Sequence, residues 1–410
     1  MTKKSTQIML ISLFLMVFTQ LTWAQHDIDL TGNVPIYGQE SCIWCGAASA
    51  QMIMDGYPNP ADRVFHTQQD IWNTIQANNS TDATDVAQGW ATDPLGLREA
   101  LRNLNPPPGG TWNIHANTSR DTVMFDILYW MNRNDYPVAT LINRGGHWVV
   151  IVGYETDIEP VSGSTPTLQE ITINDPEPHN VGSQSTMTAA VWYATDWVGP
   201  VWYAGTWDNR YVAVIEPPVA KGRVKVGRIK RIGDKIISPQ EAVRYARTWI
   251  EKLELGKKPS YAILRKKGVK ELEPLLVREQ IKPGPEEQEK VPHYYIVPFG
   301  FEHEIVQCGQ RLARACVIVN AYTGQFEEVG TFGKPVRYLP QKEALNVVAR
   351  SLGRTPPEKL RLRATLMFQP SDITHIRLYP FWKVTAANRV LYVDQLGEVH
   401  TTIKPSVPGD

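Results

Sequence analysis

The stretch Gly38-Gln39-Glu40-Ser41-Cys42-Ile43-Trp44-Cys45-Gly46-Ala47-Ala48-Ser49-Ala50-Gln51-Met52 decides the fold of the first half of this 410-residue chain. The residues from Gly46 to Asp55 are rich in Ala, Met, Gln and Ile and are followed by Gly56, which predicts a helix. Cys45 therefore stands at the N-terminus of a helix, where its thiolate is favoured and it can act as a nucleophile. Gln39 lies six residues upstream, and its amide can donate to the oxyanion of a tetrahedral intermediate beside the backbone N–H of Cys45.

The general base that such a thiol needs must come from far along the chain. Among the five histidines of residues 25–216, His147 has the best context, because Gly145-Gly146 precedes it and the apolar strand Trp148 to Val152 follows it. Asp175 ends the next predicted strand and can fix the tautomer of the histidine and stabilise its charge. Asn174 is the rival for this third role, since its amide oxygen could serve in the same way. The predicted catalytic set is therefore Cys45, His147, Asp175 and Gln39.

Helical patterns precede strand patterns in this first half, which predicts a segregated α+β domain. Further helices are expected over 67–76, 96–104 and 121–132. Strands are expected over 138–142, 148–154 and 167–173, and in a region rich in Trp and Tyr over 191–215.

The whole chain is too long for one ordinary domain, and its composition divides it. Residues 1–24 have a basic start, an apolar run of about eleven residues and a small-residue cleavage site, which predicts a secretory signal peptide and no membrane-spanning helix. Residues 25–216 form the first domain, and a proline pair at its end leads into a basic linker, 217–237. The rest contains two copies of a helix-plus-sheet unit, 238–335 and 336–405. We expect a protein exported to the periplasm or the medium.

The two halves differ in charge. Residues 25–216 hold seven arginines, no lysine and 22 acidic residues, a formal charge of −15. Residues 217–410 hold 33 basic and 20 acidic residues, a formal charge of +13. Halves of opposite sign attract each other, an effect that salt screens.

Four motifs, in order, resemble the papain-like cysteine peptidases, and in particular the branch of double-glycine, or bacteriocin-leader, peptidases. They are residues 34–39, 45–52, 145–154 and 174–176. The resemblance implies a papain-like fold, a peptide or protein substrate, and the roles given above to Gln39, Cys45, His147 and Asp175. The tandem unit of the second half resembles PepSY domains, which are associated with inhibition of secreted peptidases. It implies that the basic second half holds the catalytic half latent as an internal inhibitor.

Other interpretations remain open at this point. Cys42-Ile-Trp-Cys45 is a C-x-x-C pattern, which allows a redox role or a reversible bridge that switches the nucleophile off. A thiol acyltransferase or transglutaminase uses the same triad logic, and a secreted binding protein could keep the fold without activity. A disulfide between Cys308 and Cys316 is expected to close a hairpin. No zinc signature or phosphate-binding glycine loop occurs, so no cofactor, metal or nucleic-acid partner is expected.

Overall fold

The computed structural model describes residues 26–57, 63, 65–80, 90–104, 112–203, 205–215, 225–226, 235–280, 293–305, 310–353, 362–386 and 389–404. The predicted signal peptide, most of the basic linker and Cys308 lie outside the described residues. No helix in the described ranges is long and apolar enough to cross a membrane.

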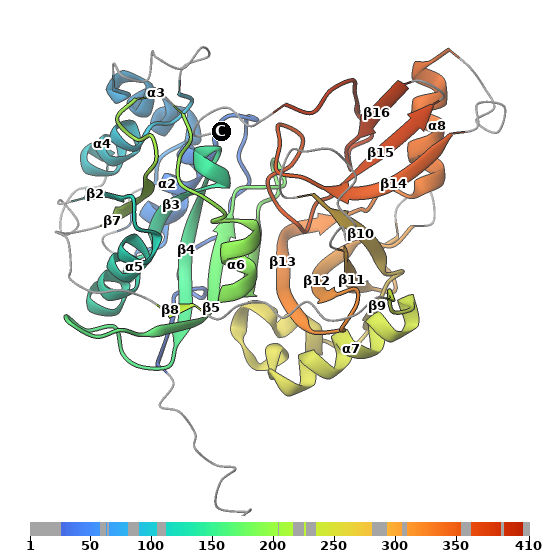
Figure 1. Ribbon diagram of the computed structural model, residues 1–410, viewed down its shortest axis with the longest axis horizontal. Helices are drawn as coiled ribbons and strands as arrows, with labels where there is room; N and C mark the ends of the chain where they lie inside the picture. The colour runs from blue at the N-terminus through green and yellow to red at the C-terminus, as the bar shows by residue number, and fades with distance from the viewer. Residues whose placement is uncertain are drawn as a thin grey trace, which may run out of the picture.

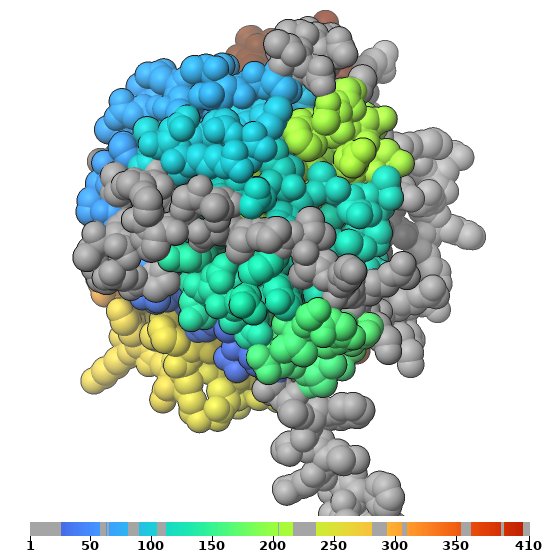
Figure 2. All heavy atoms as spheres, turned by 90° about the vertical axis from the view of Figure 1, so that its left-hand side faces the viewer, coloured from blue at the N-terminus to red at the C-terminus, as the bar shows by residue number. Residues whose placement is uncertain are grey.

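The first four helices of the first half lie on one side of the molecule, at the left of Figure 1. Two of them begin at side-chain caps, since Thr67 accepts from Asp70 N before α3 and Ser119 accepts from Thr122 N before α5. The helices predicted from the sequence correspond to α2 (Cys45–Asp55), α3 (Gln68–Asn78), α4 (Pro94–Leu104) and α5 (Arg120–Asn134). The side view in Figure 2 shows their outer face, with yellow residues of the second half at its lower edge.

An antiparallel sheet forms the rest of the first half. The pairings give the order β2-β7-β3-β4-β5-β6, and β1 shares with β3 one edge of β4. The strands are β1 (His26–Asp29), β2 (Asn113–Asn117), β3 (Val138–Ile142), β4 (His147–Thr156), β5 (Thr167–Asp175), β6 (Ser183–Thr188) and β7 (Tyr211–Ile215). The mixed helix and sheet content fits the predicted α+β class.

The aromatic region 191–215 departs from the prediction of continuous strands. Its first part is helix α6 (Ala189–Thr195), and only β7 at its end is a strand. Thr188 caps the helix by accepting a hydrogen bond from Val191 N, and Trp192 is fully buried. Packing of these aromatic side chains in the core therefore outweighs their preference for strands.

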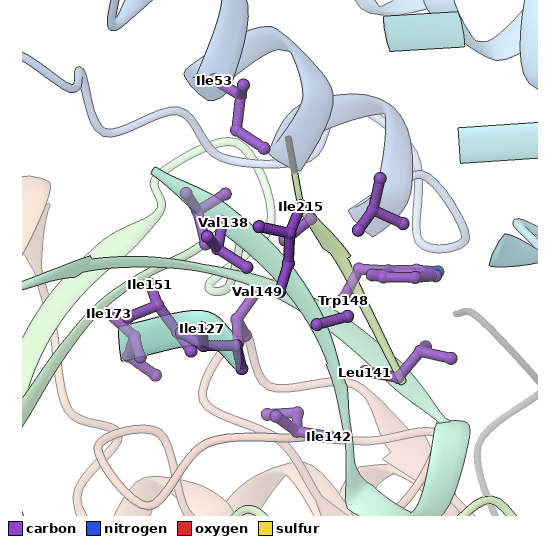
Figure 3. Packing of buried hydrophobic residues seen from close by; sticks show 14 of the residues in the cluster. Ile53, Ile127, Val138, Leu141, Ile142, Trp148, Val149, Ile151, Ile173 and Ile215 are labelled. Atoms are coloured by element: carbon purple, nitrogen blue, oxygen red, sulfur yellow. The ribbon is translucent and has the colours of Figure 1, made fainter. Parts of the chain in front are cut away.

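The core of the first half lies between α2, α5 and the sheet. In Figure 3, Ile53 of α2 lies above Val138, Val149 and Ile215 of the strands, and Trp148 lies beside them. These five side chains have at most 1 % of their surface exposed, so α2 is fixed against β4, whose first residue is His147. This packing places the start of α2 beside the start of β4.

The second half contains two helix-and-sheet modules. In the first, α7 (Pro239–Lys252) and the 3-10 turns η4 (Leu255–Lys257) and η5 (Pro259–Arg265) adjoin strands β11, β12 and β13. In the second, α8 (Gln341–Ser351) packs on β14, β15 and β16. The strands are β9 (Val269–Glu271), β10 (Leu275–Glu279), β11 (His293–Phe301), β12 (Ala313–Asn320), β13 (Phe326–Val336), β14 (Arg363–Phe368), β15 (Phe381–Ala386), β16 (Arg389–Val393) and β17 (Val399–His400). A two-residue strand, β8 (Lys225–Val226), pairs with β5.

The two halves share one sheet. β13 of the second half pairs antiparallel with β6 of the first, from Glu328 opposite Met187 to Phe332 opposite Ser183. The order continues β13-β12-β11-β10-β14-β15-β16-β17, so the sheet runs through both halves. The second half is therefore held against the first by backbone hydrogen bonds.

Candidate active site

Cys45 is the first residue of α2 and is completely buried. The residue before it, Trp44, makes no side-chain capping bond, and the first turn of the helix holds no acidic residue. The partial positive charge of the helix N-terminus therefore acts on the thiol without a neighbouring carboxylate in that turn to offset it. Trp148 N also donates a hydrogen bond to Cys45 Sγ at 3.3 Å. Both features favour the thiolate.

Gly46 allows α2 to approach the loop before α4. A Cβ built on Gly46 would lie 2.4 Å from the side chain of Thr92, which is closer than real contacts allow. Trp148 Nε1 donates to the carbonyl of Thr92 at 2.9 Å, so the same loop is tied to β4. A larger residue at position 46 would therefore force α2 and the loop at Thr92 apart.

His147 and Asp175 form a buried pair beside this thiol. His147 Nε2 lies 2.9 Å from Asp175 Oδ1, and the histidine is fully buried. Burial opposes the charged ring, but Asp175 and a hydrogen bond with Cys45 outweigh it and hold the pKa of His147 well above 6.5. The site therefore favours an imidazolium next to a thiolate.

Asn174 lies at a different place from its neighbour. Its Nδ2 donates to the carbonyls of Val34 and Pro35, at 3.3 and 3.0 Å, and its Oδ1 accepts from Gln184. Alternation along β5 therefore sends Asp175 to the histidine and Asn174 to the N-terminal segment.

Gln39 is buried at the same end of β5. Its N–H donates to the carbonyl of Pro176 at 2.9 Å, and its carbonyl accepts from Asn180 N at 2.9 Å. Its side-chain Nε2 donates to the carbonyl of Cys42 at 3.0 Å, within the loop that leads to Cys45. An oxyanion role requires this amide to turn from that carbonyl to the substrate, and the role stays a prediction.

Neither cysteine of the C-x-x-C pattern is in a disulfide; Cys42 is exposed and Cys45 is buried. Cys316 is also a free, buried cysteine in β12, and its sulfur lies 3.1 Å from Tyr338 Oη. Its predicted partner, Cys308, lies outside the described residues, so no bridge from Cys316 is described.

One residue of the site comes from the second half and was not predicted from the sequence. The ring of His375 stacks on that of His147, with 4.5 Å between ring centroids and 9° between ring planes. Burial and the charge of His147 hold the pKa of His375 well below 6.5, so it faces the imidazolium as a neutral ring. No local motif surrounds His375, and only the fold brings it here.

Side chains that could hold a metal ion gather elsewhere. Within the described ranges, the grouping found is Asp394, Glu398 and His400, in the hairpin of β16 and β17. His400 Nε2 already contacts Asp394 Oδ2 at 3.1 Å, and Asp394 Oδ1 accepts from Glu398 N. These contacts account for the cluster as a hairpin network.

A nucleophilic thiol, an imidazolium and an orienting carboxylate can together carry out acyl transfer through a covalent thioester. Comparison with known proteins indicates which kind of acyl-transfer protein the first half resembles. Residues 31–199 match the family model described as "Peptidase_C39 like family". The match contains all four predicted site residues and supports a cysteine peptidase-like domain in the first half. No curated protein and no solved structure matches the chain.

Proposed function

We propose that the protein is a cysteine peptidase in which Cys45 is the nucleophile, His147 the general acid and base, and Asp175 the residue that orients His147. The observation that carries the proposal is the 2.9 Å contact between His147 Nε2 and Asp175 Oδ1. Cys45 forms a hydrogen bond with the same imidazole ring. The peptidase-like match over residues 31–199 supports the same reaction class.

The reaction follows from these positions. The thiolate of Cys45 bonds to the carbonyl carbon of the scissile peptide, and Gln39 and the N–H of Cys45 stabilise the oxyanion. The C–N bond then breaks, and His147 gives its proton to the leaving amine. Water attacks the thioester while His147 takes its proton, which releases the acid and restores the pair.

Labelling of the reduced protein with a peptidyl epoxide, located by mass spectrometry, tests this function. Cys45 should be the labelled residue, and His147→Ala should slow labelling by at least about a hundredfold because the acid and base are lost. His66→Ala, a half-buried histidine of the same half, is the matched control. Labelling confined to Cys42 would refute the assignment and favour a redox role.

The same proposal includes export and latency. Residues 1–24 act as a signal peptide, and an antibody to the second half should find the protein outside the cytoplasm, whereas a cytoplasmic pool alone would contradict export. Latency is supported by the complete burial of Cys45 and His147 and by the stacking of His375, a residue of the second half, on His147. The second half would then act as an internal inhibitor.

His375→Ala in the full chain tests latency. Removal of the stacked ring should raise the rate of Cys45 labelling by about tenfold, since the imidazole of His147 becomes accessible. His303→Ala changes an exposed histidine of the same half and should leave the rate unchanged. A slower rate in His375→Ala would mean that His375 supports the site and does not block it.

A further inference from the structure

The segment from Ser371 to Leu378 is attached to the second half on both sides of His375. Ser371 and Thr374 form an isolated bridge, with Ser371 N donating to Thr374 O at 2.9 Å. After His375, Ile376 and Leu378 belong to the apolar core of the second half, and Tyr338 Oη donates to Leu378 O at 2.8 Å. The second half therefore presents His375 to the catalytic half on a fixed support.

The main chain of His375 is bound by the catalytic half. Its N–H donates to Glu177 Oε2 at 2.9 Å, and its carbonyl accepts from Asn143 Nδ2 at 3.1 Å. One donor and one acceptor are what any residue of a peptide offers through its backbone. His375 is thus held as a residue of a bound peptide would be, directly over His147.

Asn143 and Glu177 are fixed to the elements that carry the triad. Asn143 is in the 3-10 turn η3 (Asn143–Gly145) that leads into β4, where its N–H donates to Asp196 O and its carbonyl accepts from Gly146 N. Glu177 follows β5, and its N–H donates to Asp175 Oδ1 at 2.7 Å. The main chains of Asn143 and Glu177 are therefore fixed relative to His147 and Asp175.

We propose that Asn143 and Glu177 are substrate-binding residues, which grip the carbonyl and the N–H of one residue of a peptide next to the scissile bond. This inference rests on the proposed peptidase function. His375 occupies the place of that substrate residue, so the second half inhibits by mimicking the substrate backbone. When it leaves, a peptide restores both hydrogen bonds. The two main-chain hydrogen bonds do not depend on the side chain at this position, whereas Glu177 Oε1, 3.6 Å from His375 Nε2, also contacts the side chain of His375.

Two thiol reagents distinguish binding of a peptide backbone from access to the thiol of Cys45. Iodoacetamide needs only an accessible thiolate, whereas a peptidyl epoxide also needs its backbone held. The measurement is the ratio of the two second-order rates at Cys45 in the full chain, with the peptidyl rate divided by the iodoacetamide rate. The variants are Asn143→Gly, which tolerates the φ of 50° at this position, and Glu177→Ala. Asn103→Ala, at an exposed residue of α4, is the control.

The ratio should fall roughly tenfold in Asn143→Gly and in Glu177→Ala, as expected for losing one hydrogen bond to the peptide. It should stay unchanged in Asn103→Ala and in His375→Ala. If both rates rise together at an unchanged ratio, the two residues only dock the second half and the inference is wrong. The inference also fails if the peptidyl reagent labels no form while iodoacetamide labels Cys45. The proposed function fails separately if His147→Ala leaves the iodoacetamide rate unchanged.

Discussion

At the residue scale, three contacts with the imidazole ring of His147 set its charge and its exposure. Asp175 accepts from Nε2, Cys45 bonds to the ring, and His375 covers its face. The carboxylate stabilises the imidazolium, while the neighbouring charge keeps His375 neutral. Under the proposed function, the same contacts would ready His147 for acid–base catalysis and would cover its ring against a substrate.

Substitution of Asp175 by Asn should remove the charge that holds the pKa of His147 high. The peptidyl epoxide rate should fall by about a hundredfold or more, because opening the epoxide needs the proton of His147. The alkaline limb of its pH profile should also move to lower pH, since a lower pKa means that the ring loses this proton earlier. Asp208→Asn, at an exposed aspartate, is the control. An unshifted alkaline limb in Asp175→Asn would show that another group sets the charge of His147.

At the element scale, β6 is the strand on which the two halves depend. It pairs with β5 on one edge and with β13 on the other, and Thr186 Oγ1 lies 2.6 Å from Tyr261 Oη of η5. Without the second half, β6 would become the open edge of a sheet, which tends to pair with other chains. The first half therefore depends on the second half to pair this edge of β6.

Hydrogen exchange should report β6 as an interior strand. Amides that face β13, in the range Ser183–Met187, should exchange about as slowly as those of β4, because both strands are paired on both edges. The turn between β16 and β17, where Leu396 and Glu398 are exposed, serves as the fast-exchanging reference. Exchange of β6 at the rate of that turn would mean that the halves separate readily in solution.

Local sequence patterns predict the elements that carry Cys45, His147 and Asp175, and non-local contacts account for the features that these patterns miss. Helix α2 and strands β3 to β5 follow from periodicity and turn residues that lie within the segments themselves. The Trp, Tyr and Val residues of region 191–215 favour strands, yet the cap at Thr188 and core packing produce α6. His375 could not be found, because its contact with Asn143 joins positions 232 residues apart.

At the scale of the whole molecule, the junction of the halves buries charge. Arg377 of the second half pairs with Glu279 at 2.9 Å and contacts Glu327 and Glu328. The charge of the same guanidinium acts to lower the pKa of Asp196, which lies at the end of α6 in the first half. The predicted attraction between an acidic and a basic half also has a direct contact here, from Lys258 Nζ to Glu170 Oε2 at 3.4 Å.

These carboxyls should make the joined state sensitive to pH. Burial raises the pKa of Asp196 to about 7 and that of Glu328 to about 8, against the opposing pull of Arg377. Asp175 and Glu279 add repulsion at Asp196, and Asp196 and Glu327 add it at Glu328. Both groups hold a proton more tightly in the joined molecule than in water. Their contribution to the stability of the folded protein is fully present below their ordinary pKa values, 3.8 and 4.5. It is lost as pH rises to about 7 for Asp196 and about 8 for Glu328.

We therefore expect the stability of the native protein in urea to decline between about pH 5 and 8. His375 acts in the opposite direction, because its lowered pKa makes the joined state costly below about pH 6.5. Asp196→Asn and Glu328→Gln each remove one titrating carboxyl and should make the decline in stability with pH less steep. Glu302→Gln, at an exposed glutamate, should leave the decline unchanged. If the parent and both junction variants show one common pH dependence, the buried carboxyls do not control how the halves are joined. A flattened decline accompanied by slower Cys45 labelling at pH 8 would link these protons to closure of the active site, since the second half would then remain over His147.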